Sequence, residues 1–274
     1  MHLLRRRGIA APILLGIGGL LGTLFAGCGS NSSSATARIR GVDLSVNGST
    51  TGVLINQTAV GGDLTFGQVS SYNYVQQGIS TFSFTTTSTA ATTTVSGVAT
   101  GIVVPPDATL QLNNNSFYTA YLIGRADVAP LTVARADPRF LQTVVAGDKG
   151  AAANYLTTPY SDPPSGEANV RILNAAPDSG PVDILIGGKI VFSSATYPIL
   201  PAGITGTTNT AVNPMTAYSP QTSGNLSVQV NAAGTSTVLV PPTNISVSGG
   251  QSYTVAVTET AITPTYGLAT QNDQ

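Results

Sequence analysis

The stretch from Val182 to Phe192, VDILIGGKIVF, limits the possible folds of this chain more than any other feature of its sequence. Apolar residues stand at positions 182, 184 and 186, which is the period of a β-strand and not of a helix. Gly187 and Gly188 then supply the two residues with positive φ that a tight type I′ turn requires. The stretch therefore predicts a β-hairpin whose second strand begins at Lys189.

The two-residue turn also predicts which residues of the hairpin face one another. Counting across the turn places Ile184 opposite Val191 and Leu185 opposite Ile190. Both faces of the hairpin then carry apolar cross-strand pairs, and such pairs stabilise a sheet. We therefore expect this hairpin to belong to a hydrophobic core.

A second copy of the hairpin lies in the first half of the chain, so the sequence contains an internal repeat. Aligning the halves places Arg40 on Arg171 and the apolar run 53–55 on the run 184–186. Changes of offset add further matches, among them Tyr72 with Tyr218, Phe117 with Tyr253, and Asp137 with Asp273. Extra residues in the second copy, at 198–217, are rich in proline, glycine and threonine, which predicts an exposed loop suited to carry specificity.

Short apolar stretches separated by turn residues recur along the chain, and no helical stripe follows the first thirty residues. Together with the repeat, this pattern predicts an all-β fold of two tandem antiparallel immunoglobulin-like β-sandwich domains. We place these domains at residues 37–137 and 168–274. Residues 138–167 have no counterpart in the repeat and include Asp-Pro-Pro-Ser-Gly, so we predict that they form a linker.

Residues 1–27 have the three parts of a secretory signal peptide. Three arginines precede an apolar run, which ends in Leu-Phe-Ala-Gly-Cys. This ending resembles the lipobox of bacterial lipoproteins. The resemblance implies that Cys28 is lipidated, with palmitate as a suitable label, and becomes the first residue of the mature protein. Residues 28–36 are small and polar, which predicts a flexible tether.

Lipid anchoring predicts an exported protein that stays on a membrane of the cell envelope. In lipoproteins of double-membraned bacteria, an aspartate after the cysteine is an inner-membrane retention signal. This chain has Gly29 there, so the outer membrane is the expected location. An uncleaved transmembrane anchor is the alternative, because the apolar run 9–25 lies at the short limit for a span.

The predicted processing restricts the chemistry that remains in the mature protein. The only histidine is His2, the only cysteine is Cys28, and the chain has no tryptophan. Histidine-dependent triads, cysteine nucleophiles and zinc sites with His or Cys ligands are therefore excluded. Loss of the three signal-peptide arginines leaves 8 basic residues against 12 acidic ones, a net charge of about −4. The sequence contains no basic patch, so we do not expect a nucleic-acid partner.

Three short motifs in the second half carry a family resemblance: Asn-Val-Arg at 169–171, Asn-Ala-Ala-Pro-Asp at 174–178, and Pro-Val-Asp at 181–183. This half resembles the bacterial domain of unknown function DUF4397. Residues 66–72, Phe-Gly-Gln-Val-Ser-Ser-Tyr, are similar to the middle strands of the same family. The resemblance implies an exported protein with tandem domains and without an assigned activity.

Six side chains are candidates for contact with a ligand: Asp178, Asp183, Arg171, Arg40, Tyr155 and Tyr160. The two aspartates suit a calcium site or a glycosidase pair, but an aspartate before Ser-Gly is usually a turn former. The arginines suit a fork for a carboxylate or a sulfate, or are solvated strand residues whose stems cover apolar surface. The tyrosines suit a sugar-stacking platform. No catalytic residue, cofactor or metal ligand is predicted.

These observations predict a lipid-anchored, non-enzymatic protein of the cell envelope. Its β-sandwiches would bind an envelope glycan or a surface protein, or serve as a structural module. Two alternatives stay open: a polysaccharide hydrolase that uses carboxylates alone, and a passive surface spacer.

Overall fold

A computed structural model of the chain describes residues 35–88, 102–126, 139, 141–151, 160–198, 215–260 and 264–273. The described residues form β-strands, turns and irregular segments, and none of them is helical. The prediction of an all-β fold is confirmed. No helix in these ranges is long and apolar enough to cross a membrane.

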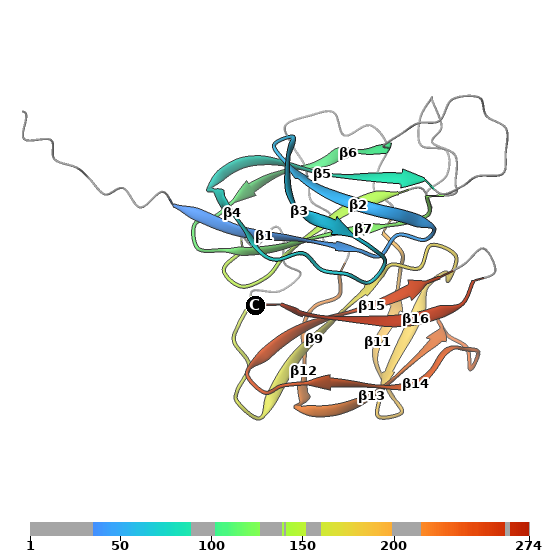
Figure 1. The fold of residues 1–274 in the computed structure, drawn as a ribbon. Coiled ribbons are helices and arrows are strands. Elements are labelled where there is room, and N and C mark those ends of the chain that lie inside the picture. The colour runs from blue at the N-terminus through green and yellow to red at the C-terminus, as the bar shows by residue number, and fades with distance from the viewer. Residues whose placement is uncertain are drawn as a thin grey trace, which may run out of the picture. The chain divides into compact units, whose positions relative to one another are not determined.

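Eight strands make up the N-terminal half of the fold, which we define as residues 36–151 (Figure 1). They are β1 (Thr36–Asp43), β2 (Gly48–Ile55), β3 (Thr58–Leu64), β4 (Asn73–Gln76), β5 (Gly78–Ser88), β6 (Ile102–Leu112), β7 (Phe117–Ile123) and β8 (Gln142–Gly147). The strands form two four-stranded sheets, ordered β4-β1-β7-β8 and β3-β2-β5-β6. Both sheets contribute to one apolar cluster that includes Ile39, Phe82 and Leu122.

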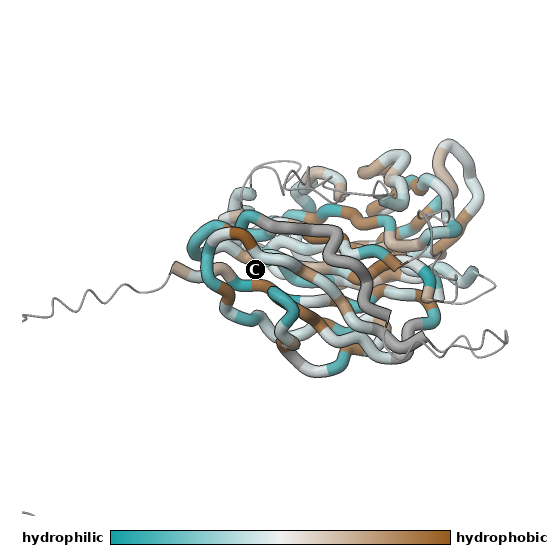
Figure 2. Tube along the Cα trace, turned by 90° about the horizontal axis from the view of Figure 1, so that it is seen from above, coloured by the Kyte–Doolittle hydropathy of each residue, from teal (hydrophilic) through white to brown (hydrophobic). Residues whose placement is uncertain are grey.

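Eight further strands make up the C-terminal half, residues 167–273. They are β9 (Glu167–Asn174), β10 (Val182–Ile186), β11 (Lys189–Ala195), β12 (Ser219–Thr222), β13 (Gly224–Ala232), β14 (Val238–Val247), β15 (Gln251–Glu259) and β16 (Tyr266–Asp273). Their sheets are ordered β12-β9-β15-β16 and β11-β10-β13-β14, which repeats the strand order of the N-terminal half. A second apolar cluster, including Val170, Ile184 and Val255, lies within this half. Brown and teal segments alternate over short distances in Figure 2, as expected for strands with one face toward a core.

The hairpin predicted from the sequence is β10–β11. Gly187 and Gly188 have φ of 59° and 79°, as a type I′ turn requires. The pairing of Leu185 with Ile190 is confirmed, but Ile184 lies opposite Phe192 and not opposite Val191. A register shift follows the Leu185–Ile190 pair and displaces the returning strand.

The prediction that all strands run antiparallel is wrong for one strand pair in each half. Strand β1 pairs with β7 in parallel, and β9 pairs with β15 in parallel. Alternation along a segment indicates a strand but carries no information on its direction in the sheet. The sheets β4-β1-β7-β8 and β12-β9-β15-β16 therefore contain both parallel and antiparallel pairs.

Strand β8 lies inside the segment that the sequence predicted to be a linker. Residues 142–147 pair with β7 and are all buried. This part of the segment completes a sheet of the N-terminal half, while the boundaries of the two domains stay a prediction.

Several predictions lie outside the described residues. They concern the signal peptide, Cys28, the tether up to residue 34, Tyr155 and the loop residues 199–214.

Residues Ser34–Gln274 form one compact unit, so the contacts between the two halves lie within a single unit.

Candidate functional site

A buried group of charged and polar side chains joins the two halves. We call it the arginine cluster, and its members are Arg40, Thr119, Asp148, Arg171, Thr254 and Asp273. The parallel pairing of β1 with β7 sets Arg40 beside Thr119, and that of β9 with β15 sets Arg171 beside Thr254. The two arginines therefore occupy the same position in their respective sheets.

Each half builds the same chain of hydrogen bonds. In the N-terminal half, Nε of Arg40 donates to Oγ1 of Thr119 at 3.0 Å, and this hydroxyl donates to Oδ2 of Asp148 at 2.6 Å.

In the C-terminal half, Nε of Arg171 donates to Oγ1 of Thr254 at 2.8 Å, and this hydroxyl donates to Oδ2 of Asp273 at 2.7 Å. The two series of hydrogen bonds agree atom by atom. The halves therefore share this local arrangement of side chains as well as a strand order.

The arginines also reach across to the opposite half. Nη2 of Arg171 lies 2.6 Å from Oδ1 of Asp148, and its Nη1 donates to the carbonyl oxygen of Gly147 at 2.8 Å. In return, Arg40 donates to the carbonyl oxygen of Asn272 and lies 3.7 Å from Oδ1 of Asp273. The exchange is reciprocal, although the contact made by Arg171 is the closer one.

A tyrosine ring lies over each guanidinium. The Tyr72 ring centroid is 4.8 Å from Arg40, and the Tyr218 ring centroid is 4.6 Å from Arg171. These distances suit a cation–π contact, which gains strength where water is excluded. The Tyr218 hydroxyl also donates to Oδ2 of Asp273 at 2.9 Å.

The electrostatics of the arginine cluster follow from its burial. Burial raises the pKa of the Asp148 carboxyl to about 6, and the nearby carboxylate of Asp273 adds to this rise. The arginines oppose the rise because they favour the charged form. Burial also raises the pKa of the Tyr218 hydroxyl, which therefore stays neutral at physiological pH.

Apolar residues of both halves lie on or next to the strands that carry the arginine cluster. They form a third apolar cluster: Val42, Leu44, Tyr121, Ile123, Val144 and Ala146 from the N-terminal half, and Leu173, Ala175, Met215 and Ala256 from the C-terminal half. This cluster packs apolar residues from two sheets, one in each half, against one another.

The expectation that Arg40 and Arg171 are solvated strand residues is wrong. Their exposed fractions are 8% and 1%. The sequence could not reveal this burial, because the face that carries the arginines is the outer face of each predicted sandwich. Only the packing of one half on the other covers it.

A second ion-pair group also links the halves. Nη1 of Arg125 donates at 2.8 Å both to Asp178 and to the buried carboxylate of Glu259. Arg139 adds a contact of 3.1 Å to the other oxygen of Asp178. Burial raises the pKa of Glu259, while the backbone N–H of Asp178 and the charge of Arg125 favour its ionised form.

The structure gives Asp178 and Asp183 different partners. Asp178 belongs to the second ion-pair group, whereas the Asp183 carboxylate accepts backbone N–H groups of Ser194 at 2.8 Å and Gly234 at 2.9 Å. These two bonds lower the pKa of Asp183. Within the described ranges, no group of three His, Cys, Asp or Glu residues could hold a metal ion.

Tyr160 is half-buried and does not stand free as a stacking platform. Its ring meets the ring of Tyr218 edge to face, with centroids 5.9 Å apart, and its hydroxyl accepts from Oγ of Ser252 at 3.3 Å.

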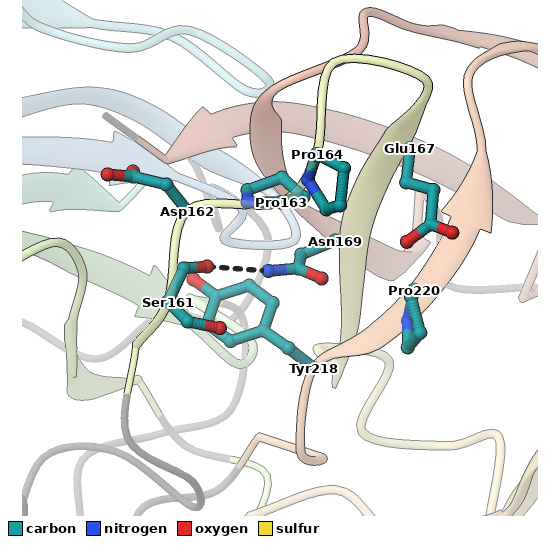
Figure 3. Close-up of a pocket in the computed structure, with 8 residues that line it drawn as sticks. All are labelled: Ser161, Asp162, Pro163, Pro164, Glu167, Asn169, Tyr218 and Pro220. Carbon is teal, nitrogen blue, oxygen red and sulfur yellow. Dashed lines mark hydrogen bonds between the residues drawn. The ribbon is translucent and has the colours of Figure 1, made fainter.

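A pocket of about 370 Å³ lies on the C-terminal half beside Tyr218. We call it the β9–β12 pocket, because β9, β12 and the segment before β9 line it (Figure 3). Its lining residues are Ser161, Asp162, Pro163, Pro164, Glu167, Asn169, Tyr218 and Pro220.

Comparison with protein families bears on this half of the chain. Residues 168–274 match the model of DUF4397, a domain of unknown function. A DUF4397 domain is found there. The match covers 107 of the 274 residues, and a search among curated proteins finds no match to the chain.

The DUF4397 domain supplies half of the arginine cluster, namely Arg171, Thr254 and Asp273. It also supplies Asn169 and Tyr218 of the β9–β12 pocket, whereas Glu167 lies one residue before the matched range.

Sequence reasoning missed most partners of the two arginines: Thr119, Asp148 and Thr254. A usable signal was present, because each arginine has a threonine in the parallel strand beside it and an aspartate directly after the edge strand or at its end. The repeat alignment matched Asp137 with Asp273, whereas the structure sets Asp148 in the equivalent position.

Proposed function

We propose that the protein is a lipid-anchored, non-enzymatic component of the bacterial cell envelope in which two β-sandwich domains act together as one rigid binding or structural module. The observation that carries this proposal is the reciprocal exchange in the arginine cluster. Its two arginines and two aspartates are buried against one another between the halves. Groups used in this way position the domains and are not presented to a substrate.

We further propose that the N-terminal half is a second, divergent copy of the C-terminal domain, and that both are immunoglobulin-like. The repeated strand order and the matching register of Arg40 with Thr119 and of Arg171 with Thr254 support this relationship. Tandem copies explain why the contact between the halves is reciprocal.

The location follows from the N-terminal sequence. The arginines, the apolar run and the cysteine in Leu-Phe-Ala-Gly-Cys support export and lipidation at Cys28. Gly29 favours the outer membrane. A module on a flexible tether would then present its surfaces to envelope glycans or to other surface proteins.

A hydrolase that uses only carboxylates is less well supported. Asp178 and Glu259 come close together, but both bind the same Nη1 of Arg125. Both carboxylates are therefore directed at one cation, whereas the two carboxyls of a glycosidase flank the glycosidic bond.

Calorimetry of the soluble chain from Gly29 onward tests the module. Because the two halves share buried charges and an apolar cluster, we expect a single cooperative unfolding transition. Two separate transitions, each reproduced by one isolated half, would contradict the rigid module. Incubation of the same chain with envelope polysaccharide tests the absence of enzymatic activity, and release of new reducing ends would contradict it.

A further inference from the structure

The β9–β12 pocket holds a hydrogen-bond acceptor that the protein does not use. Asn169 lies on β9 with an exposed fraction of 8%, and its Nδ2 donates to the carbonyl oxygen of Ser161 at 2.9 Å. No donor among the described residues bonds its Oδ1. Figure 3 shows this oxygen turned away from Ser161, toward the space between Tyr218 and Pro220. The bond to Ser161 fixes the amide, so this oxygen has a set direction.

A second acceptor stands two residues earlier on the same strand. Glu167 is exposed, and its carboxylate makes no ion pair or hydrogen bond within the part of the chain that the structure describes. Residues two apart in a strand lie on the same face, with Cα atoms about 7 Å apart. In Figure 3 the carboxylate of Glu167 extends beside Pro220, on the same side as Oδ1 of Asn169.

The rings of proline and tyrosine side chains form the walls of the pocket. Pro164 and Pro220 lie on either side of the two acceptors, and the ring of Tyr218 lies near Asn169 (Figure 3). The Tyr218 ring is held in place, because its hydroxyl bonds Asp273 and its face contacts Arg171. The pocket therefore needs little rearrangement to accept a ligand, and such pre-organisation favours binding.

We propose that the β9–β12 pocket binds a neutral saccharide. Two hydroxyls on one sugar ring donate to Glu167 and to Oδ1 of Asn169, and the C–H groups of the ring pack on the prolines and on Tyr218. Bonds from hydroxyls to a carboxylate are strong because they are charge-assisted. This inference goes beyond the rigid module, which does not depend on it.

Other ligand classes fit the pocket less well. Glu167 repels acidic sugars and phosphates, whereas the charge of Asp162 is paired with Lys149, and the residues that line the pocket include no cationic side chain. A single ammonium group is compact, whereas the two acceptors extend from positions about 7 Å apart on β9. A rigid ring with several hydroxyls can satisfy both acceptors at once.

Titration calorimetry on the soluble chain from Gly29 onward tests the proposal. The neutral probes are the methyl glycosides of glucose, galactose and mannose, and N-acetylglucosamine. Glucosamine and glucuronate are the charged probes, and neutral envelope polysaccharide distinguishes a polymer from a free sugar. We expect at least one neutral probe to bind, and Glu167→Gln to weaken its affinity at least tenfold.

Asp63→Asn is the matched control, because it removes one exposed carboxylate on β3, outside the pocket lining. It should leave the affinity unchanged. The proposal is overturned if no neutral probe binds, if glucosamine or glucuronate binds more tightly than every neutral sugar, or if Glu167→Gln and Asp63→Asn have equal effects. A thermal melt of each variant shows whether it is folded.

Discussion

Arg171 and Asp148 belong to different halves of the chain, and their side chains meet at 2.6 Å with almost no exposure to solvent. Asp148 follows β8, at the end of the first half, while Arg171 lies in the first strand of the second half. The pair therefore connects the last part of one sheet to the centre of another. Its burial makes it sensitive to the loss of either partner.

We predict that Arg171→Ala lowers the free energy of unfolding by about 3–5 kcal/mol, because it leaves buried carboxylates without their cation. Urea denaturation of the soluble chain measures the change. The control is Lys149→Ala, since Lys149 pairs with Asp162 on the surface. An exposed pair is worth under about 1 kcal/mol. Equal losses in the two variants would mean that the pair with Asp148 adds nothing to stability.

The raised pKa of Asp148 predicts how stability changes with pH. Its pKa rises from 3.8 to about 6 on folding. A group with a raised folded pKa contributes stability that is fully present below the unfolded value and is lost as the pH rises through the folded value. We therefore expect this carboxyl to make the protein more stable near pH 4 than at pH 7.

The test compares wild type with Asp148→Asn, a variant that cannot titrate at this position. Between pH 4 and 7, wild type should lose on the order of 1–3 kcal/mol more than the variant. Asp183 and Asp162 have lowered pKa values and act in the opposite direction in both proteins. The difference between the two curves reports the titration of Asp148 together with its charged neighbours, and parallel curves would contradict the prediction.

The sequence predicted the β10–β11 hairpin well because its turn is local. Two glycines with positive φ determine the turn, and the pairing of Leu185 with Ile190 follows from it. The prediction that Ile184 pairs with Val191 is wrong, although this pair lies only one residue further from the turn. There the backbone N–H of Ser194 bonds the carboxylate of Asp183, a contact that no residue spacing reveals.

The repeat alignment failed by one residue where a hydrogen bond decides the register. It matched Phe117 with Tyr253, but the structural equivalent of Tyr253 is Tyr118. The hydroxyl of each of these tyrosines accepts a backbone N–H five residues earlier, from Ser248 and from Asn113. The burial of Arg40 and Arg171 was beyond reach for another reason, since it depends on contacts between segments far apart in sequence.

Within the hairpin, Ile184→Ala should destabilise the protein more than Lys189→Ala. Ile184 is fully buried in the core of the C-terminal half, so its truncation leaves a cavity and costs about 2–5 kcal/mol. Lys189 is exposed, and its truncation should cost under about 1 kcal/mol. Denaturant melts compare the variants, and equal losses would place the hairpin at the periphery of the fold.

For anchoring, we predict that Cys28→Ser abolishes incorporation of labelled palmitate and leaves an unprocessed precursor. Lipid attachment in bacterial lipoproteins proceeds through the cysteine thiol, and this chain has no second cysteine. The measurement is metabolic labelling followed by electrophoresis. Equal label in wild type and variant would exclude a lipidation site at Cys28.

The last prediction concerns the minimum length of the N-terminal half. A fragment of residues 35–151 should be more stable than one of residues 35–137, because only the longer fragment contains β8. This strand pairs with β7 along its whole length, and its Val145 and the preceding Leu141 join the apolar core of this half. Loss of these contacts exposes apolar surface and leaves β7 as an edge strand.

Urea melts of the two fragments, followed by circular dichroism, measure this difference. A fragment of residues 35–151 with Val145→Asp is the matched control, since it keeps the length but places a charge in the core. It should lose most of the gained stability. If the fragment ending at residue 137 were as stable as the longer one, β8 would be an accessory strand, and the contact of Asp148 with Arg171 would be the main role of this segment.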